Sequence, residues 1–229
     1  MERYNIITSK KPREIVLLKS FPCIWGKCTF CDYTEDNSIN KEELLQINHE
    51  ILTKVTGETG VLEIINSGSC FELPIETLEE IRCIIIQKQV KQLLFESHWV
   101  YRHKLQEMRD FMGIPILFKI GVETFHNEFR QNYLKKNADF KTPEEVRNYF
   151  DSPCLLVGIK GQTKEMVEED IRHLKRYFDH GTINVFTNNS TPVKKDEALI
   201  EWFIKKYKYL EHDSAIEILY ENTDFGVGT

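Results

Sequence analysis

Three cysteines in one short loop, Cys23, Cys28 and Cys31, are the residues of this sequence most able to do chemistry. Their C-x4-C-x2-C spacing allows three thiolates to converge on one small inorganic centre. Thiolates at this spacing suit an iron–sulfur cluster. Three ligands instead of four leave one iron open to bind another molecule. We therefore expect a cluster that takes part in a reaction as well as storing an electron.

Two other kinds of metal site use clustered cysteines. A plant-type ferredoxin has the same spacing with a distant fourth cysteine, which Cys70 or Cys83 could supply. Such carriers are small, whereas this chain has more sheet and helix than electron transfer requires. A structural zinc site is disfavoured because no fourth Cys or His follows at zinc-finger spacing. Cys83 and Cys154 lie within apolar runs, where a buried free thiol is expected.

The overall composition narrows the class of protein. A chain of 229 residues with 41% hydrophobic and 29% charged residues is long enough for one sizeable domain. Its formal net charge of −6 argues against non-specific binding to the nucleic-acid backbone, although a single nucleotide remains a possible substrate. The sequence contains neither an apolar run near 18 residues nor a signal-peptide core, so we expect a cytoplasmic protein without membrane contact.

Short apolar runs alternate with amphipathic stretches along the chain, which predicts a parallel sheet covered by helices. Six such units fall short of the eight that close a full barrel, so the predicted fold class is α/β, a partial TIM-like (β/α)6 barrel with a curved sheet and outer helices. The predicted strands cover residues 14–19, 61–66, 92–96, 115–123, 154–159 and 183–186, with a further one at 215–220; the predicted helices cover 41–54, 75–89, 101–112, 127–136, 164–178 and 197–209.

In a barrel of this kind the active face lies at the carboxyl ends of the strands. In the sequence, residues that could bind a cofactor or take part in a reaction lie at or just beyond the ends of these predicted strands. They are the three cysteines, Ser67-Gly68-Ser69, Glu96, Glu123, Gly158 and Asn188.

The cysteine loop after a first strand, the six strand–helix units and the glycine-bearing strand ends together resemble the radical S-adenosylmethionine (SAM) superfamily. The resemblance covers nearly the whole chain and implies one domain over residues 1–229, with a core of about 12–210 and a tail, 211–229, that closes the active site. Phe30 matches the aromatic residue that this family prefers before its third cysteine, and the resemblance implies that it is one of the cofactor-binding residues.

The resemblance implies two cofactors. Cys23, Cys28 and Cys31 would hold three irons of a [4Fe–4S] cluster, and the amino and carboxylate groups of SAM would chelate the fourth. One electron, from a donor such as flavodoxin or ferredoxin, would then release a 5′-deoxyadenosyl radical that removes a hydrogen atom from the substrate.

The resemblance also implies where SAM binds. Ser67-Gly68-Ser69 takes the place of the family's Gly-Gly-Glu, so its backbone rather than a carboxylate would receive the amino group. Glu123 would accept hydrogen bonds from the ribose, and Gly158 and Val185 would lie beside the adenine. Each position also has a plainer interpretation: a turn for Ser67-Gly68-Ser69 and Gly158, and an exposed strand end for Glu123.

The substrate is expected to be small and nucleotide-like, because the sequence contains neither a second cysteine cluster nor a separate RNA-binding domain. Among compact members the chain resembles the queuine lyases of queuine salvage, a branch of tRNA modification. This implies a lyase that breaks the N-glycosidic bond of queuosine 5′-phosphate and releases queuine. Candidate substrate-binding residues are Glu96, His98, Asn188 and Asp224. Radical enzymes of 7-deazapurine synthesis, glycyl-radical activases and ferredoxin-like carriers remain as alternatives.

Overall fold

The computed structural model describes residues 2–221, so Asp224 and the end of the predicted tail lie outside the described residues. The chain divides into two compact units. The first comprises residues 2–26 and 33–118, and the second comprises residues 27–32 and 119–221. The interpretation of the whole chain as one domain stays a prediction.

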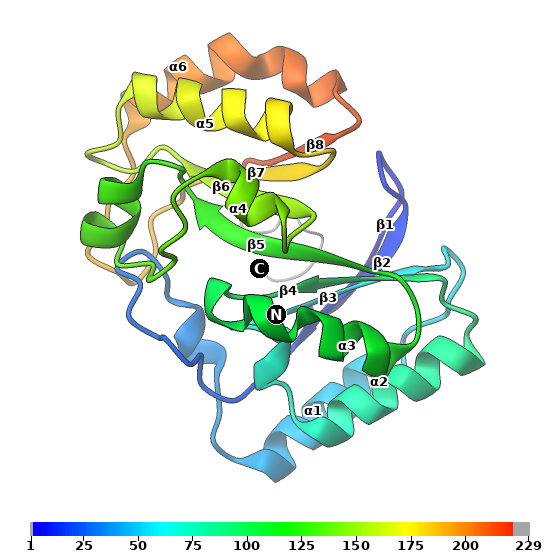
Figure 1. Cartoon of the computed structure of the whole chain (residues 1–229). Helices are drawn as coiled ribbons and strands as arrows, with labels where there is room; N and C mark the ends of the chain where they lie inside the picture. The colour runs from blue at the N-terminus through cyan, green and yellow to red at the C-terminus, as the bar shows by residue number, and fades with distance from the viewer. Residues whose placement is uncertain (1, 222–229) are drawn as a thin grey trace. The chain divides into compact units, whose positions relative to one another are not determined.

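The first unit contains strands that follow one another in the sheet in sequence order. The first strand runs antiparallel to the second, and the next pairs are parallel. The helices α1 to α3 lie on one side of β3 and β4 (Figure 1). The elements are β1 (Tyr4–Ile7), β2 (Arg13–Leu18), η1 (Tyr33–Asp36), α1 (Lys41–Leu52), β3 (Val61–Asn66), η2 (Cys70–Glu72), α2 (Ile75–Gln87), β4 (Gln92–Glu96), η3 (Trp99–Lys104) and α3 (Leu105–Met112).

Strand β5 (Ile116–Glu123) carries the chain into the second unit, where all strand pairs are parallel. Helices α5 and α6 lie on one side of β6 to β8 (Figure 1). The further elements are η4 (Phe129–Tyr133), α4 (Pro143–Arg147), β6 (Ser152–Val157), α5 (Lys164–Tyr177), β7 (Gly181–Val185), α6 (Glu197–Tyr207), η5 (Lys208–His212) and β8 (Ile216–Leu219).

Local sequence explains why these elements form where they do. Helix α5 begins after Thr163, whose side chain accepts a hydrogen bond from the Met166 N–H at 3.3 Å. Its buried side chains, Val167, Ile171 and Leu174, recur at helical spacing and face the sheet. Strand β6 is buried along its whole length, as a parallel strand covered on both faces must be.

The predicted alternation of strands and helices is confirmed, but four local expectations were wrong. Strand β1 was not predicted. The helix predicted at 127–136 ends at Tyr133 and consists mainly of the π-helical turn η4, and the helix predicted at 101–112 begins as the 3₁₀ turn η3. Cys83 is exposed, because α2 buries another face, whereas Cys154 is buried as expected.

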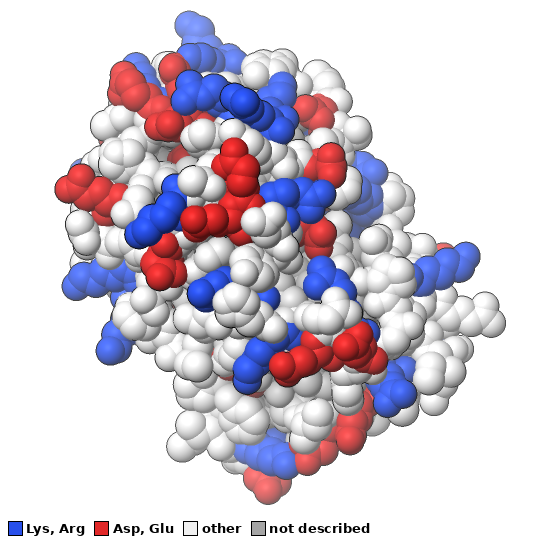
Figure 2. All heavy atoms as spheres, in the orientation of Figure 1, with Lys and Arg blue, Asp and Glu red and all other residues white. Residues whose placement is uncertain are grey.

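Two observations bear on possible partners. Among the described residues, no helix combines the length and apolar composition needed to cross a membrane. On the face shown in Figure 2, Lys and Arg side chains lie among Asp and Glu side chains. A face of mixed charge differs from the basic surface that binding to nucleic-acid backbone requires.

Candidate cluster and cofactor site

Cys23, in the first unit, lies beside the loop that follows β3. A Cβ atom added to Gly68 would lie 3.5 Å from both Cα and Cβ of Cys23 and 2.7 Å from Oε2 of Glu72. The distances to Cys23 are ordinary van der Waals contacts, whereas a side chain at Gly68 would require the Glu72 carboxylate to move. The structure thus brings together the first predicted cluster ligand and the predicted SAM-binding Ser67-Gly68-Ser69.

Some polar groups of the Ser67-Gly68-Ser69 loop already form hydrogen bonds with neighbouring protein residues. The Ser69 carbonyl accepts hydrogen bonds from Asn66 Nδ2 at 3.0 Å and from the Glu72 N–H at 2.9 Å. The Ser69 hydroxyl donates to Ser97 Oγ at 3.0 Å. The predicted contact with the amino group of SAM therefore rests on Ser67 and Gly68.

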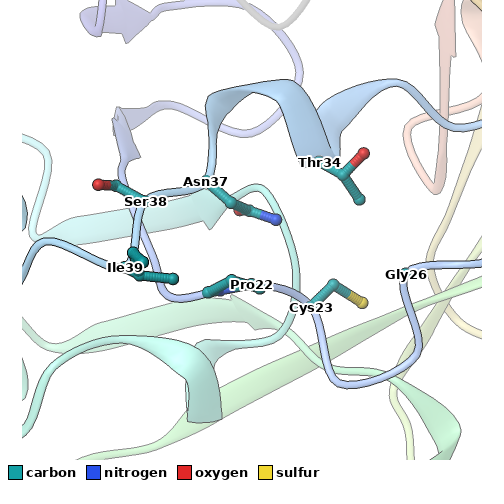
Figure 3. Close-up of a pocket in the computed structure, with 7 residues that line it drawn as sticks. All are labelled: Pro22, Cys23, Gly26, Thr34, Asn37, Ser38 and Ile39. Atoms are coloured by element: carbon teal, nitrogen blue, oxygen red, sulfur yellow. The ribbon is translucent and has the colours of Figure 1, made fainter.

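An open pocket of about 510 Å³ adjoins Cys23 within the first unit. Cys23 and Asn37 extend from opposite walls toward the same space (Figure 3). The Asn37 Nδ2 atom is buried without a hydrogen-bond partner, which leaves an unused donor at this pocket. The lining residues are Pro22, Cys23, Gly26, Thr34, Asn37, Ser38 and Ile39.

Cys28 and Cys31 lie in the second unit, on a segment fixed by hydrogen bonds. The Thr29 N–H donates to the Leu134 carbonyl at 3.0 Å, and its hydroxyl donates to the Tyr133 carbonyl at 2.8 Å. Asn189 Nδ2 donates to the Phe30 carbonyl at 2.8 Å. These contacts hold the residues that flank both cysteines.

An ion pair between the half-buried Lys136 and the buried Glu123 accompanies these two cysteines. Lys136 Nζ lies 2.6 Å from Glu123 Oε1 and 5.7 Å from the centre of the Phe30 ring. Burial alone lowers the pKa of Lys136, but the charges of Glu123, Cys28 and Cys31 outweigh it and raise the pKa above its ordinary value. Lys136 is thus a fixed cation near two expected cluster ligands, and no spacing pattern in the sequence indicated it.

The backbone at Glu123 is shaped to make this pair. Glu123 is buried with φ +64°, at a bulge where the β5–β6 register shifts. A side chain at Gly121 would collide with the Glu123 carboxylate and approach Lys136 Nζ to 2.7 Å. Glu123 is therefore a buried ion-pair partner and not an exposed strand end, while its predicted contact with ribose stays a prediction.

Gly158 and Val185 lie where two strands of the second unit end. Gly158 has φ +94°, its N–H donates to Gln162 Oε1 at 2.9 Å, and its carbonyl accepts from the Asp196 N–H at 2.7 Å. Val185 is buried and pairs with Val157. Their contact with adenine is not tested by these hydrogen bonds and stays a prediction.

The predicted substrate-binding residues have visible local roles. His98 Nδ1 accepts a hydrogen bond from the Val100 N–H at 3.3 Å and caps η3. Asn188 Oδ1 accepts from the Lys195 N–H at 2.9 Å. Glu96 is the half-buried last residue of β4. Substrate binding by these residues stays a prediction.

The donor set fits an iron–sulfur cluster chemically. Cys23, Cys28 and Cys31 are half-buried and form no disulfide bond, and thiolates are the usual ligands of such clusters. Within residues 2–221, no three His, Cys, Asp or Glu side chains already lie at metal-binding distances from one another. The assignment therefore rests on spacing, thiol chemistry and the cation near two of the ligands.

Comparison with known proteins supplies an independent test. No family model and no curated protein sequence matches the chain. Among solved structures, the queuine lyase from Clostridium spiroforme bound to SAM and queuine is 55% identical, with a TM-score of 0.98 over 100% of both chains. A radical SAM methyltransferase from Sphaerobacter thermophilus is 12% identical, with a TM-score of 0.62 over 95% of this chain and 68% of that chain.

These similarities confirm the predicted fold class. The second comparison, at low identity, supports the radical SAM partial-barrel fold alone. The first extends over the full length at an identity that relatives of one family share. The cysteine motif, the parallel strand–helix units and this full-length similarity together place the chain in the queuine lyase family of the radical SAM superfamily.

Proposed function

We propose that this protein is a radical SAM lyase that releases queuine from queuosine 5′-phosphate by breaking its N-glycosidic bond. The observation that carries the proposal is the 55% identity, over the whole chain, to a queuine lyase bound to SAM and queuine. The C-x4-C-x2-C motif supplies the thiolate ligands for the iron–sulfur cluster that such a reaction needs.

Cys23, Cys28 and Cys31 would hold three irons of a [4Fe–4S] cluster, and the backbone of Ser67 and Gly68 would receive the amino group of SAM. When bound, the cluster and SAM supply the radical that starts the reaction. The protein's own contribution is to bind, orient and shield the reactants.

Lys136 contributes a positive charge near the cysteines. Three thiolates add negative charge to a partly buried site, where uncompensated charge is unfavourable. Lys136 offsets part of that charge, and its ion pair with Glu123 at 2.6 Å holds the ammonium in place. Phe30, whose ring lies 5.7 Å from the ammonium, adds an apolar surface beside the cysteines.

Substrate recognition would use groups at the ends of the strands and beside Cys23. A guanine-like edge presents two adjacent N–H donors, which the Glu96 carboxylate could accept as a pair. The unused Asn37 donor suits an oxygen acceptor, such as a carboxylate, phosphate or carbonyl oxygen. The electron donor, which we expect to be a flavodoxin or ferredoxin, belongs to the same proposal.

The test is anaerobic. The protein is reconstituted with iron and sulfide, reduced with dithionite, and assayed for 5′-deoxyadenosine and queuine with and without queuosine 5′-phosphate. We expect cleavage of SAM to be stimulated by the nucleotide and accompanied by queuine. Unstimulated cleavage without queuine would reject the substrate but keep the radical chemistry. The absence of any cleavage by a fully loaded cluster would favour an electron carrier.

A further inference from the structure

Glu72, the last residue of η2, connects the start of the cysteine loop to the loop after β3. Its carboxylate is buried, and its two oxygens accept different backbone N–H groups. Oε1 accepts from Ile24, the residue after Cys23, at 3.1 Å, and Oε2 accepts from Ser69. The Glu72 carbonyl also accepts from the Phe21 N–H at 3.0 Å. One residue thus holds the chain on both sides of Cys23.

The surroundings of Glu72 are built for a carboxylate. Gly68 leaves room for Oε2, which would lie 2.7 Å from a Cβ atom at that position. Tyr101 hydrogen-bonds to the carboxylate, and the Tyr101 ring stacks on Phe71 with centroids 4.8 Å apart. Burial and the Glu72 charge raise the pKa of Tyr101, so its hydroxyl stays protonated and donates to the carboxylate.

The physical consequence follows from the energetics of buried hydrogen bonds. The buried Ser69 N–H is costly to leave without an acceptor, and for both N–H groups a bond to a charged acceptor is stronger than one between neutral groups. Without the carboxylate, the N–H groups of Ile24 and Ser69 would both lose their acceptor. The two loops would then lose the link that the carboxylate makes and would keep only the backbone bond between Phe21 and Glu72.

We propose that Glu72 is a positioning residue that joins the first cluster ligand to the SAM-binding loop, so that retention of the cluster and affinity for SAM depend on the same carboxylate. The inference rests on the proposed function because it needs Cys23 as a ligand and Ser67-Gly68-Ser69 as the cofactor loop. It adds a residue that no sequence motif indicated.

Glutamine is the informative replacement for Glu72. It has nearly the same size, but it offers one acceptor oxygen and one NH2 donor. Facing two N–H donors, the amide side chain of the Glu72→Gln variant can satisfy only one, and its NH2 group repels the other. Tyr101→Phe is a milder second variant, because it removes only the hydroxyl that supports the carboxylate.

The experiment compares Glu72→Gln and Tyr101→Phe with the wild type and with Glu76→Gln. Glu76 is a matched control because it lies four residues away, is only half-buried and pairs with Lys41 instead of with the cysteine loop. Three quantities are measured on reconstituted protein: iron and sulfide per chain, the dissociation constant of SAM, and the electron paramagnetic resonance (EPR) spectrum of the reduced cluster before and after SAM is added. Circular dichroism checks the fold.

For Glu72→Gln we expect a native circular dichroism spectrum and less iron per chain than in the wild type. We also expect SAM to bind at least tenfold more weakly and no longer to change the EPR spectrum. Tyr101→Phe should shift the same quantities in the same direction by less, and Glu76→Gln should match the wild type. Wild-type iron content and SAM affinity in both Glu72→Gln and Tyr101→Phe would overturn the inference. If Glu72→Gln loses its fold, Tyr101→Phe alone decides. These readouts use no queuosine nucleotide, so failure of the substrate proposal would leave them unchanged.

Discussion

At the residue scale, Lys136 places a half-buried positive charge near the Cys28 and Cys31 thiolates. A nearby cation stabilises the reduced cluster, which carries one more negative charge than the oxidised one. We therefore expect Lys136→Met to lower the reduction potential of the cluster by on the order of 50 mV, from Coulomb's law in a medium of intermediate dielectric constant. Redox titration followed by EPR measures this directly.

Lys136→Arg is the control for charge, since it keeps the cation while changing the shape of the side chain. Its potential should stay within a small fraction of the Lys136→Met shift. An unchanged potential in Lys136→Met, with the cluster fully loaded, would show that this ammonium does not act on the cluster.

Asp170 provides a prediction on pH. Burial raises the pKa of Asp170 from its ordinary value of 3.8 to about 7, against the opposing effects of the Phe125 N–H, the Thr124 hydroxyl and Arg130. The folded state thus holds a proton that the unfolded state releases near pH 4. The stabilisation that Asp170 contributes is fully present below pH 4 and is lost as the pH rises toward 7.

Asp170→Asn stays neutral at every pH and removes this dependence. The free energy of unfolding of Asp170→Asn minus that of the wild type should therefore increase by about 1–3 kcal/mol between pH 5 and pH 8. Urea denaturation of both proteins at each pH measures this difference. Asp179→Asn is the matched control, because the Asp179 side chain is 81% exposed. A constant difference between Asp170→Asn and the wild type across this range would contradict the prediction.

At the element scale, the turn between β6 and α5 depends on Gly158. Its φ of +94° is strained for other residues, and an added Cβ would collide with Ile200 Cγ1 and lie 2.8 Å from Ile200 Cδ1. We expect Gly158→Ala to lower the free energy of unfolding by about 2–4 kcal/mol, from backbone strain plus overpacking. Chemical denaturation measures the loss.

Gly113→Ala separates these two contributions. Gly113 also has a positive φ, +73°, but a Cβ there meets nothing within 4 Å. Its loss should be about 1 kcal/mol, from strain alone. Equal losses in the two variants would mean that contact with Ile200 contributes nothing.

Sequence patterns located most elements because buried parallel strands are continuous apolar runs between turn residues. The predicted strands at 61–66 and 92–96 coincide with β3 and β4. At residues 127–136 the pattern predicted a helix but neither its π-helical form nor its end. There the buried Arg130 guanidinium donates to the Ala138, Thr124 and Phe140 carbonyls and holds a π-helical turn. A single sequence carries no signal for such contacts.

The same distinction applies to the candidate site. The three cysteines could be found because their spacing is local. Glu72 and Lys136 could not, since their roles come from contacts with residues distant in the chain: Ile24 lies 48 positions from Glu72, and Glu123 lies 13 positions from Lys136. The role of Gly121, which leaves room for the ion pair of Glu123 and Lys136, likewise becomes visible only in the folded structure.

At the scale of the whole molecule, the proposed SAM-binding residues extend from Phe30 to Val185 in the sequence. No unfolded chain presents such a set together, so SAM should bind the folded state almost exclusively. At a SAM concentration 100 times its dissociation constant, binding stabilises the fold by about 2.7 kcal/mol. For a chain of this size, that corresponds to a rise in Tm of roughly 5–10 °C.

Anaerobic thermal unfolding of cluster-loaded protein, with and without SAM, tests this expectation. Cys28→Ala, treated identically, is the matched control because it removes one of the three thiolates while leaving the proposed SAM-binding residues in place. SAM should raise the Tm of the loaded wild type and leave that of Cys28→Ala nearly unchanged, since the open iron supplies two of the contacts with SAM. An equal rise in both proteins would mean that SAM binds independently of the cluster, and the role assigned to Cys28 would have to be abandoned.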